Sequence, residues 1–212
     1  PEWYTKDLGK RWLTMETLLK HWPANMWIQT PLELTDRLLT EHDIKKDDIA
    51  EIIVDPPTYL RMYYSPDGYS SMMQAQFSIP YMLACLILDH TPGANWCDET
   101  KLKDSEILAL AAKIHGGNSD MLYMPQCFKN FQKGRHPVIT VTIKTFSGKE
   151  YSETMEGHLG HPRMMMTPEQ FKDRFRIQAA PTLRGDKLEQ VADLLANVER
   201  CDDMAKVGEL LR

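Results

Sequence analysis

Residues 74–88 read QAQFSIPYMLACLIL, and this stretch decides how the chain can fold. Residues 79–88 form an unbroken apolar and aromatic run, so a helix there must be buried on nearly all sides. Pro80 would break a continuous helix, so we expect a break near Ser78, with Ser78 capping the second helix. The two glutamines and a tyrosine-rich segment just upstream need partners where they are buried, which predicts that the core meets a site wall here.

Outward from this helix, helical and strand patterns are interspersed along the body of the chain, which is typical of an α+β fold. The first 30 residues are expected to be irregular or extended, and residues 118–136 show no clear pattern. The predicted elements of the body are a helix at 31–41 capped by Thr30, a strand at 49–54, a turn at 65–68, a broken helix at 70–88, a helix at 104–115 closed by Gly116-Gly117, and a β-hairpin of strands 138–146 and 149–155.

The last part of the chain is predicted to be helical. Thr167-Pro168-Glu169-Gln170 is a capping box with proline at the first helical position, and helical patterns recur at about 185–199 and 202–211. Each of these helices has one apolar stripe, so each must dock on the body or on polypeptide absent from this chain. We therefore divide the chain into an α+β domain at 1–165 and a C-terminal helical segment at 166–212.

Composition excludes several partners and sites. The net charge of −5 argues against a nucleic acid or an anionic membrane surface as partner, and the longest apolar run of ten residues is too short to cross a bilayer. The four cysteines lack zinc-ribbon spacing and no signal peptide is visible, so we expect reduced thiols and a cytoplasmic protein. His158 and His161 are the only close histidine pair; without a third ligand nearby, a solvated turn and no metal are expected.

Candidate chemistry rests on one lysine and a tyrosine pair. Lys20 stands beside aromatic and proline residues, where it is either a point charge for a carboxylate ligand or a surface lysine whose stem covers Trp22. Tyr63 and Tyr64 either donate a hydrogen bond or a proton to a substrate, or pack as aromatics with their hydroxyls at the surface. The sequence lacks the motifs of nucleophile-elbow hydrolases, P-loop enzymes, Rossmann binders and zincins.

Five motifs gain meaning from their order. They are Leu8-Gly9-Lys10-Arg11-Trp12 followed by Lys20-His21-Trp22-Pro23, then Asp47-Asp48-Ile49-Ala50-Glu51-Ile52, then Gln74 to Tyr81, then Pro137 to Gly148, and last Gly160-His161-Pro162 followed by Met166 to Phe175. This order resembles the C-terminal part of the MmgE/PrpD family, which contains 2-methylcitrate dehydratases, cis-aconitate decarboxylases and iminodisuccinate epimerases. The segment AQFSIPY at 75–81 closely matches a helix of that family and is the most specific of the five.

The resemblance implies an incomplete enzyme. Family members are considerably longer and have a large N-terminal helical domain, which would make this chain a fragment or subunit containing the smaller α+β domain. Its tail helices would dock on the helical domain, and the active site would lie in the cleft between the two. The implied partners are that N-terminal helical domain or subunit, a small carboxylate substrate and further copies of the chain, as in a dimer or other homo-oligomer.

The implied chemistry is abstraction of a proton next to a carboxylate, with loss of water or carbon dioxide from a citrate-like di- or tricarboxylate. It needs no metal or organic cofactor, but it needs a base and cations that hold the developing charge. The expected catalytic residues are Lys20, Tyr63 and Tyr64, and the expected substrate-binding residues are Lys20, His21, Asn25 and Gln74. Asn25 stands where some relatives have a histidine, and no residue of this chain fits the base, as a half-site predicts.

Two other functions are open at this stage. Within the same family, the chain could belong to an epimerase that returns the proton to the other face of an iminodisuccinate-like substrate. From a different class, it could be a non-catalytic module that binds a partner through its methionine-rich and tail-helix surfaces.

Asp67-Gly68 replaces an Arg-Pro pair of some family members, so recognition of a tricarboxylate is expected to differ here.

Overall fold

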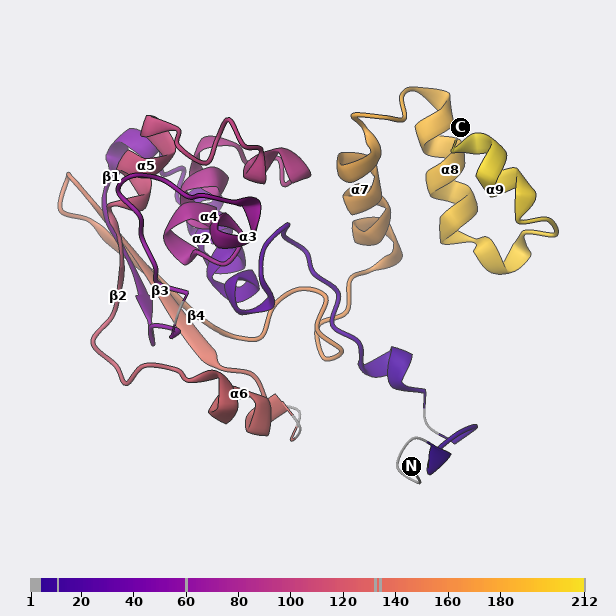
Figure 1. The fold of residues 1–212 in the computed structure, drawn as a ribbon, viewed down its shortest axis with the longest axis horizontal. Helices are drawn as coiled ribbons and strands as arrows, with labels where there is room; N and C mark the ends of the chain where they lie inside the picture. The colour runs from indigo at the N-terminus through magenta and orange to yellow at the C-terminus, as the bar shows by residue number, and fades with distance from the viewer. Residues whose placement is uncertain (1–4, 11, 60, 132, 134, 212) are drawn as a thin grey trace.

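The computed structural model describes residues 5–10, 12–59, 61–131, 133 and 135–211. These residues form a sheet with helices on one face, followed by a group of helices that lies apart from the sheet (Figure 1). The strands are β1 (Ile49–Asp55), β2 (Ile114–Gly116), β3 (Val138–Thr145) and β4 (Glu150–Glu156). The helices are α2 (Gln29–Glu41), α3 (Met72–Ala75), α4 (Ile79–Leu88), α5 (Ser105–Ala111), α6 (Met124–Phe131), α7 (Pro168–Ala179), α8 (Asp186–Ala196) and α9 (Ala205–Leu210). This mixture confirms the predicted α+β fold class.

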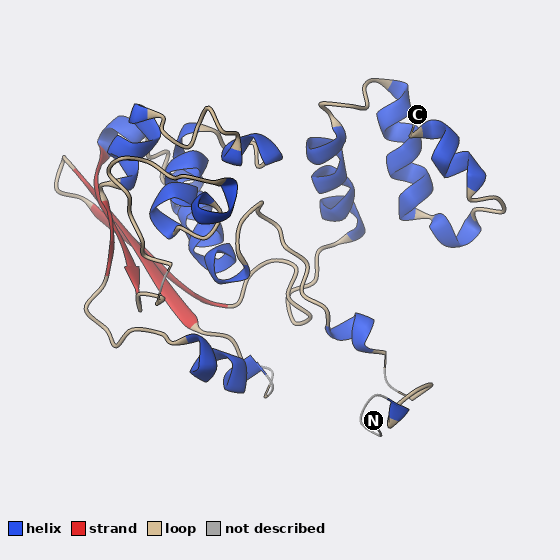
Figure 2. Cartoon of the chain, viewed as in Figure 1, coloured by secondary structure: helices blue, strands red, loops and turns tan. Residues whose placement is uncertain are grey.

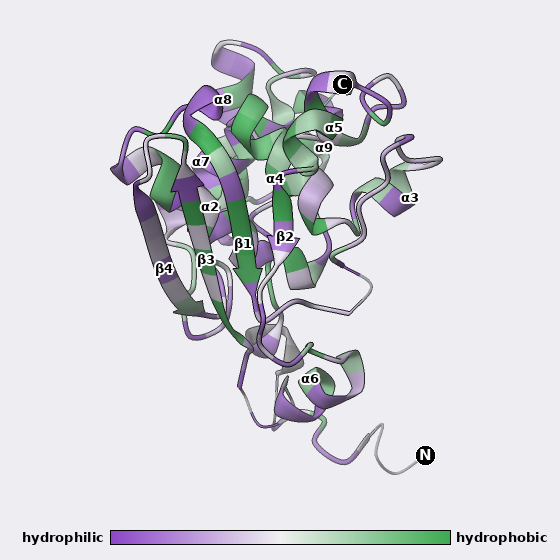
Figure 3. Cartoon of the chain, turned by 90° about the vertical axis from the view of Figure 1, so that its left-hand side faces the viewer, coloured by the Kyte–Doolittle hydropathy of each residue, from purple (hydrophilic) through white to green (hydrophobic). Residues whose placement is uncertain are grey.

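The sheet has the order β2-β1-β3-β4, with β2 parallel to β1 and the other neighbours antiparallel. Burial alternates along β3, where Ile139, Val141 and Ile143 are buried and join the core that the helices cover. Figure 3 looks onto the opposite face of the sheet. The hydroxyl groups of Thr140 and Thr142 pair with hydroxyl groups of β4 at 2.8 and 2.9 Å. The predicted strands at 49–54, 138–146 and 149–155 are therefore confirmed.

Helix α4 is the centre of the core. All of its residues except Leu88 are buried, and it packs against α2 and α5. Ser78 caps it, because its Oγ accepts a hydrogen bond from the backbone N–H of Tyr81 at 3.2 Å, and Pro80 lies in the first turn. Helix α3 ends at Ala75, so the predicted break near Ser78 is confirmed.

Three elements of the body differ from the expectation. Helix α2 begins at Gln29 rather than Pro31, and the Thr30 hydroxyl does not cap it but donates to the carbonyl oxygen of Gly157 at 2.6 Å. The predicted helix at 104–115 ends at Ala111, and its last residues instead form β2, since pairing with β1 satisfies their backbone groups. Helix α6 occupies part of the region that showed no clear pattern.

The tail consists of α7, α8 and α9, which Figure 2 shows as a group of helices joined to the body by a long loop. The capping box at Thr167 is present as predicted. Helix α7 has no buried residue, and the buried residues of the described tail are Leu183, Val191, Ala192 and Val207. Among the described residues, no helix combines the length and the apolar character needed to span a membrane.

Candidate functional site

Three segments that are far apart in the sequence meet beside the start of α4. We call this place the three-segment junction and define it by residues 20–25, 61–64 and 74–78. The backbone N–H of Asn25 donates to the carbonyl oxygen of Gln76 at 3.0 Å, and that of Ile79 donates to the carbonyl oxygen of Arg61 at 2.7 Å. The hydroxyl of Ser78 also donates to the carbonyl oxygen of Tyr63 at 2.6 Å. The structure thus joins the predicted lysine loop, tyrosine segment and glutamine segment through backbone contacts.

Buried polar contacts fix the loop at 20–25. The side chain of Gln29, which is fully buried, donates to the carbonyl oxygens of Trp22 and Ala24 at 3.0 and 3.1 Å and accepts from the N–H of Trp22 at 2.9 Å. Just before the loop, the N–H of Leu19 donates to the carbonyl oxygen of Gly160 at 2.9 Å. Gly160 has a φ of +95°, and a Cβ there would come within 2.2 Å of the Leu19 carbonyl oxygen, so only glycine fits.

Arg61 is a member of the junction that sequence reasoning missed. Its Nε donates to Oδ1 of Asn25 at 3.3 Å, and its guanidinium carbon lies 4.5 Å from the ring centroid of Phe77. Burial lowers the pKa of Arg61, yet an arginine remains charged in proteins. The signal in the sequence was weak: Arg61 is the only cation in the tyrosine-rich segment at 59–69.

The remaining junction residues differ in their accessibility. Lys20 is exposed, and its ammonium group makes no hydrogen bond or ion pair with the described residues. The Oδ1 atom of Asn25 accepts twice, since it also accepts from the N–H of Trp27 at 3.2 Å. Gln74 is exposed, but its Oε1 already accepts from the backbone and the hydroxyl of Ser70, both at 2.9 Å. Of Lys20, Asn25 and Gln74, Lys20 therefore has the polar group that is most available to a ligand.

The two tyrosines have different surroundings. Tyr63 is 53% exposed, and its ring lies edge-on to that of Tyr69 with centroids 6.0 Å apart. Tyr64 is half-buried and packs against the hydrophobic core. Of the two predicted candidates, Tyr63 therefore presents its side chain to solvent at the junction and Tyr64 serves mainly as packing.

His21 makes a side-chain contact of its own on α2. Its Nδ1 lies 3.0 Å from Oε2 of Glu33, which also accepts from Nε1 of Trp22 at 3.2 Å. Burial alone would raise the pKa of Glu33, but the hydrogen bond and charge of His21 outweigh burial, so the pKa is lowered and Glu33 is ionised at neutral pH. His21 lines a cavity beside α7, and none of the other predicted site residues lines that cavity.

The turn containing His158 and His161 was expected to be solvated, but it is buried. The two residues are 2% and 7% exposed, because Gly157 and Gly160 allow the turn to fold against the loop at 19–25 and against His136. The ring centroids of His136 and His161 lie 3.9 Å apart. Nδ1 of His158 donates to the carbonyl oxygen of Leu159 at 2.8 Å. Within the described parts of the chain, no group of three or more His, Cys, Asp or Glu residues is arranged to hold a metal ion.

The junction offers cations and a hydroxyl group but contains no evident base. Lys20 and Arg61 supply positive charge, and Tyr63 supplies a hydroxyl donor. The three segments contain no Asp or Glu, and their one imidazole, that of His21, is paired with Glu33. The three segments therefore supply positive charge and a hydrogen-bond donor, but no group placed to abstract a proton.

Comparisons with known proteins match most of the chain. A family model described as the MmgE/PrpD C-terminal domain matches residues 22–200. A cis-aconitate decarboxylase of Homo sapiens is 22% identical over 178 residues, covering 80% of this chain. The chain spans 35% of the length of that relative. The matched residues include Asn25, Arg61 and the whole segment at 74–78, whereas Lys20 and His21 lie just before the first of them.

Proposed function

The chain belongs to the MmgE/PrpD family, whose C-terminal domain it matches, and from this premise we propose that it forms one wall of a lyase active site. The substrate is a citrate-like di- or tricarboxylate such as 2-methylcitrate or cis-aconitate. The reaction begins with abstraction of a proton next to a carboxylate and ends with loss of water or of carbon dioxide. The opposite wall and the base come from an N-terminal helical domain or subunit, and the assembly is a cytoplasmic homo-oligomer such as a dimer.

One observation carries this proposal: the guanidinium of Arg61 is held at the junction by Asn25 and by the ring of Phe77. A cation fixed in this way can receive a carboxylate without first being ordered, which lowers the entropic cost of binding. Lys20 adds a mobile charge from the neighbouring loop, and Tyr63 adds a donor for the enolate-like oxygen that forms as the proton leaves.

A matched set of variants in the complete enzyme tests the proposal. We expect Lys20→Ala and Arg61→Gln each to weaken binding of the carboxylate by about 1.5–3 kcal/mol, the range for hydrogen bonds to charged groups. Lys149→Ala is the control, because Lys149 is exposed in the hairpin turn of the sheet. Steady-state kinetics with 2-methylcitrate, cis-aconitate and iminodisuccinate give both the effect and the substrate. Unchanged kinetic constants for both site variants would remove the junction from the active site.

The same assay separates the two alternatives. Turnover of iminodisuccinate alone would favour an epimerase over a dehydratase or decarboxylase. A non-catalytic partner-binding module is supported by a different feature, the exposed apolar side chains of the tail, which include Phe171 and Ile177 on α7. That module would bind the helical partner without turnover of any of the three acids.

A further inference from the structure

The cavity that His21 lines has a volume of about 330 Å³ and lies between the body and α7. Its volume is within the range of small-molecule sites, roughly 300–1,000 Å³. The body contributes His21, Glu33, Pro92 and Leu159, the segment before α7 contributes Met166, and α7 contributes Gln170, Asp173, Arg174, Ile177 and Gln178. The side chain of Gln178 ties α7 to the body at this place, because its amide donates to the carbonyl oxygen of Pro92 at 2.6 Å.

Arg174 is the unusual member of this cavity. Its Nη1 is buried and has no hydrogen-bond partner among the described residues, and its side chain forms no ion pair with them. Burial lowers the pKa of Arg174, but the guanidinium keeps its charge at neutral pH. Arg174 as a whole is only half-buried, but a buried donor atom without a partner is costly, and an anion that accepts from Nη1 in the cavity would remove that cost.

The acidic residues of the cavity are already engaged. Glu33 accepts hydrogen bonds from His21 and Trp22, and Asp173 pairs with Arg176 on the same helix. Neither carboxylate forms an ion pair with Arg174 among the described residues. The two nearby negative charges would however repel a dianion such as inorganic phosphate more strongly than a singly charged carboxylate.

We propose that this cavity binds a small organic monocarboxylate, whose carboxyl group Arg174 holds through its planar fork of donors. Leu159, Met166 and Ile177 pack against the apolar stem of the ligand. Of the junction residues, only His21 lines this cavity, and the binding proposed for it depends on neither the lyase activity nor its substrate. Helix α7 has no buried residue of its own, so binding of the ligand between α7 and the body would stabilise the position of α7 against the body.

Butyrate is the probe that tests this site, titrated into the full chain by isothermal calorimetry. We expect saturable binding at one site, with Arg174→Gln weakening it about 10- to 100-fold, as loss of a charge-assisted hydrogen bond requires. Arg184→Gln is the matched control, because Arg184 is an exposed arginine just after α7. Arg174→Lys keeps the charge without the fork and should retain part of the affinity. Circular dichroism and urea midpoints establish that each variant is folded.

Several results would overturn the assignment. Butyrate that fails to saturate the wild-type chain, or that binds Arg174→Gln as tightly as wild type, removes the site. Phosphate that binds more tightly than butyrate removes the monocarboxylate class. Binding that is lost in Arg61→Gln and kept in Arg174→Gln places the carboxylate at the junction instead, which would support the proposed lyase site while rejecting this one.

Discussion

Helices α4 and α7 are of similar length but are held in place by different forces. In α4 every residue except Leu88 is buried, and its neighbours are the apolar side chains of α2 and α5. In α7 no residue is buried, and its main packing partner is α8. Apolar burial is the dominant favourable contribution to folding, so the body should be stable by itself and the tail only marginally so.

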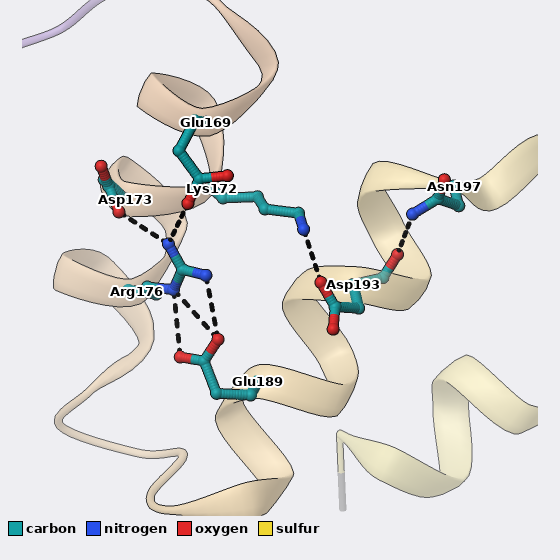
Figure 4. A network of polar contacts seen from close by, with 7 residues as sticks. All are labelled: Glu169, Lys172, Asp173, Arg176, Glu189, Asp193 and Asn197. Carbon is teal, nitrogen blue, oxygen red and sulfur yellow. Dashed lines mark hydrogen bonds and ion pairs between the residues drawn. The ribbon is translucent and has the colours of Figure 1, made fainter.

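The helices α7 and α8 of the tail are joined by ion pairs at the surface. Arg176 binds Glu189 of α8 through two nitrogens at 2.9–3.1 Å and contacts Glu169 and Asp173 on its own helix at 2.8 and 2.6 Å (Figure 4). Lys172 and Asp193 form a further pair between α7 and α8. Exposed ion pairs contribute little and are screened by salt, so this network orients two helices without replacing a core. The body is therefore held together by its apolar core, whereas α7 and α8 are held to each other largely by charge pairs.

The largest effect is expected in the core of the body. Leu83 is fully buried in α4, so Leu83→Ala should lower the free energy of unfolding by about 2–5 kcal/mol through lost burial and a residual cavity. Urea denaturation followed by tryptophan fluorescence measures the change. Leu195→Ala in α8 is the control, because Leu195 is 37% exposed and should cost much less. Equal losses at the two positions would contradict the contrast between body and tail.

A smaller effect is expected from acid, and again in the body. Burial, with the charges of His161 and His158 beside it, lowers the pKa of His136 from 6.5 to about 4. The unfolded chain therefore binds a proton at this imidazole at a higher pH than the folded chain does. Above pH 6.5 the His136 imidazole is neutral in both states and the free energy of unfolding keeps its full value. That free energy decreases as pH falls toward about 4. Urea midpoints across that range should decline for the wild type and less steeply for His136→Gln.

His115 provides the control for the acid experiment, since it is an exposed histidine at the end of the same sheet. His115→Gln should keep the full decline in the urea midpoint. If His136→Gln and His115→Gln declined in parallel, the buried imidazole cluster would not be the source of the acid sensitivity.

The smallest effect is expected in the tail. Arg176→Ala removes the contacts to Glu189, Glu169 and Asp173, so amide hydrogen exchange in α7 and α8 should become faster while exchange in α4 stays the same. Added salt should reproduce part of this change in the wild type. Arg200→Ala is the control, because among the described residues the guanidinium of Arg200 forms an ion pair only with its neighbour Glu199. Faster exchange throughout the body after Arg176→Ala would show that the two regions are not independent.

Local sequence signals explain which predictions succeeded. Ser78 and Pro80 lie next to the element they control, so the start of α4 was predictable, as was α7 from its capping box. Thr30 carried a similar capping signal, but its hydroxyl binds Gly157, which is 127 residues away in the chain. Residues 114–116 became a strand for a related reason, because pairing with β1 competes with one more turn of helix.

The candidate sites show the same division. Lys20, Tyr63 and Asn25 could be proposed from residue type, motif order and family resemblance, whereas Arg61 and Arg174 acquired a role only through their surroundings in three dimensions. The roles of the proposed residues remain predictions, as does the division into domains at 1–165 and 166–212.

By itself the sequence determined the α+β class, the buried helix and the family, because periodicity, capping and motif order are properties of neighbouring residues. Only the tertiary structure decided which cations meet which segments, which imidazoles are dry and which guanidinium lacks a partner. Those features depend on distances between residues far apart in the chain and on the solvent that packing excludes, and a linear order of residues specifies neither directly.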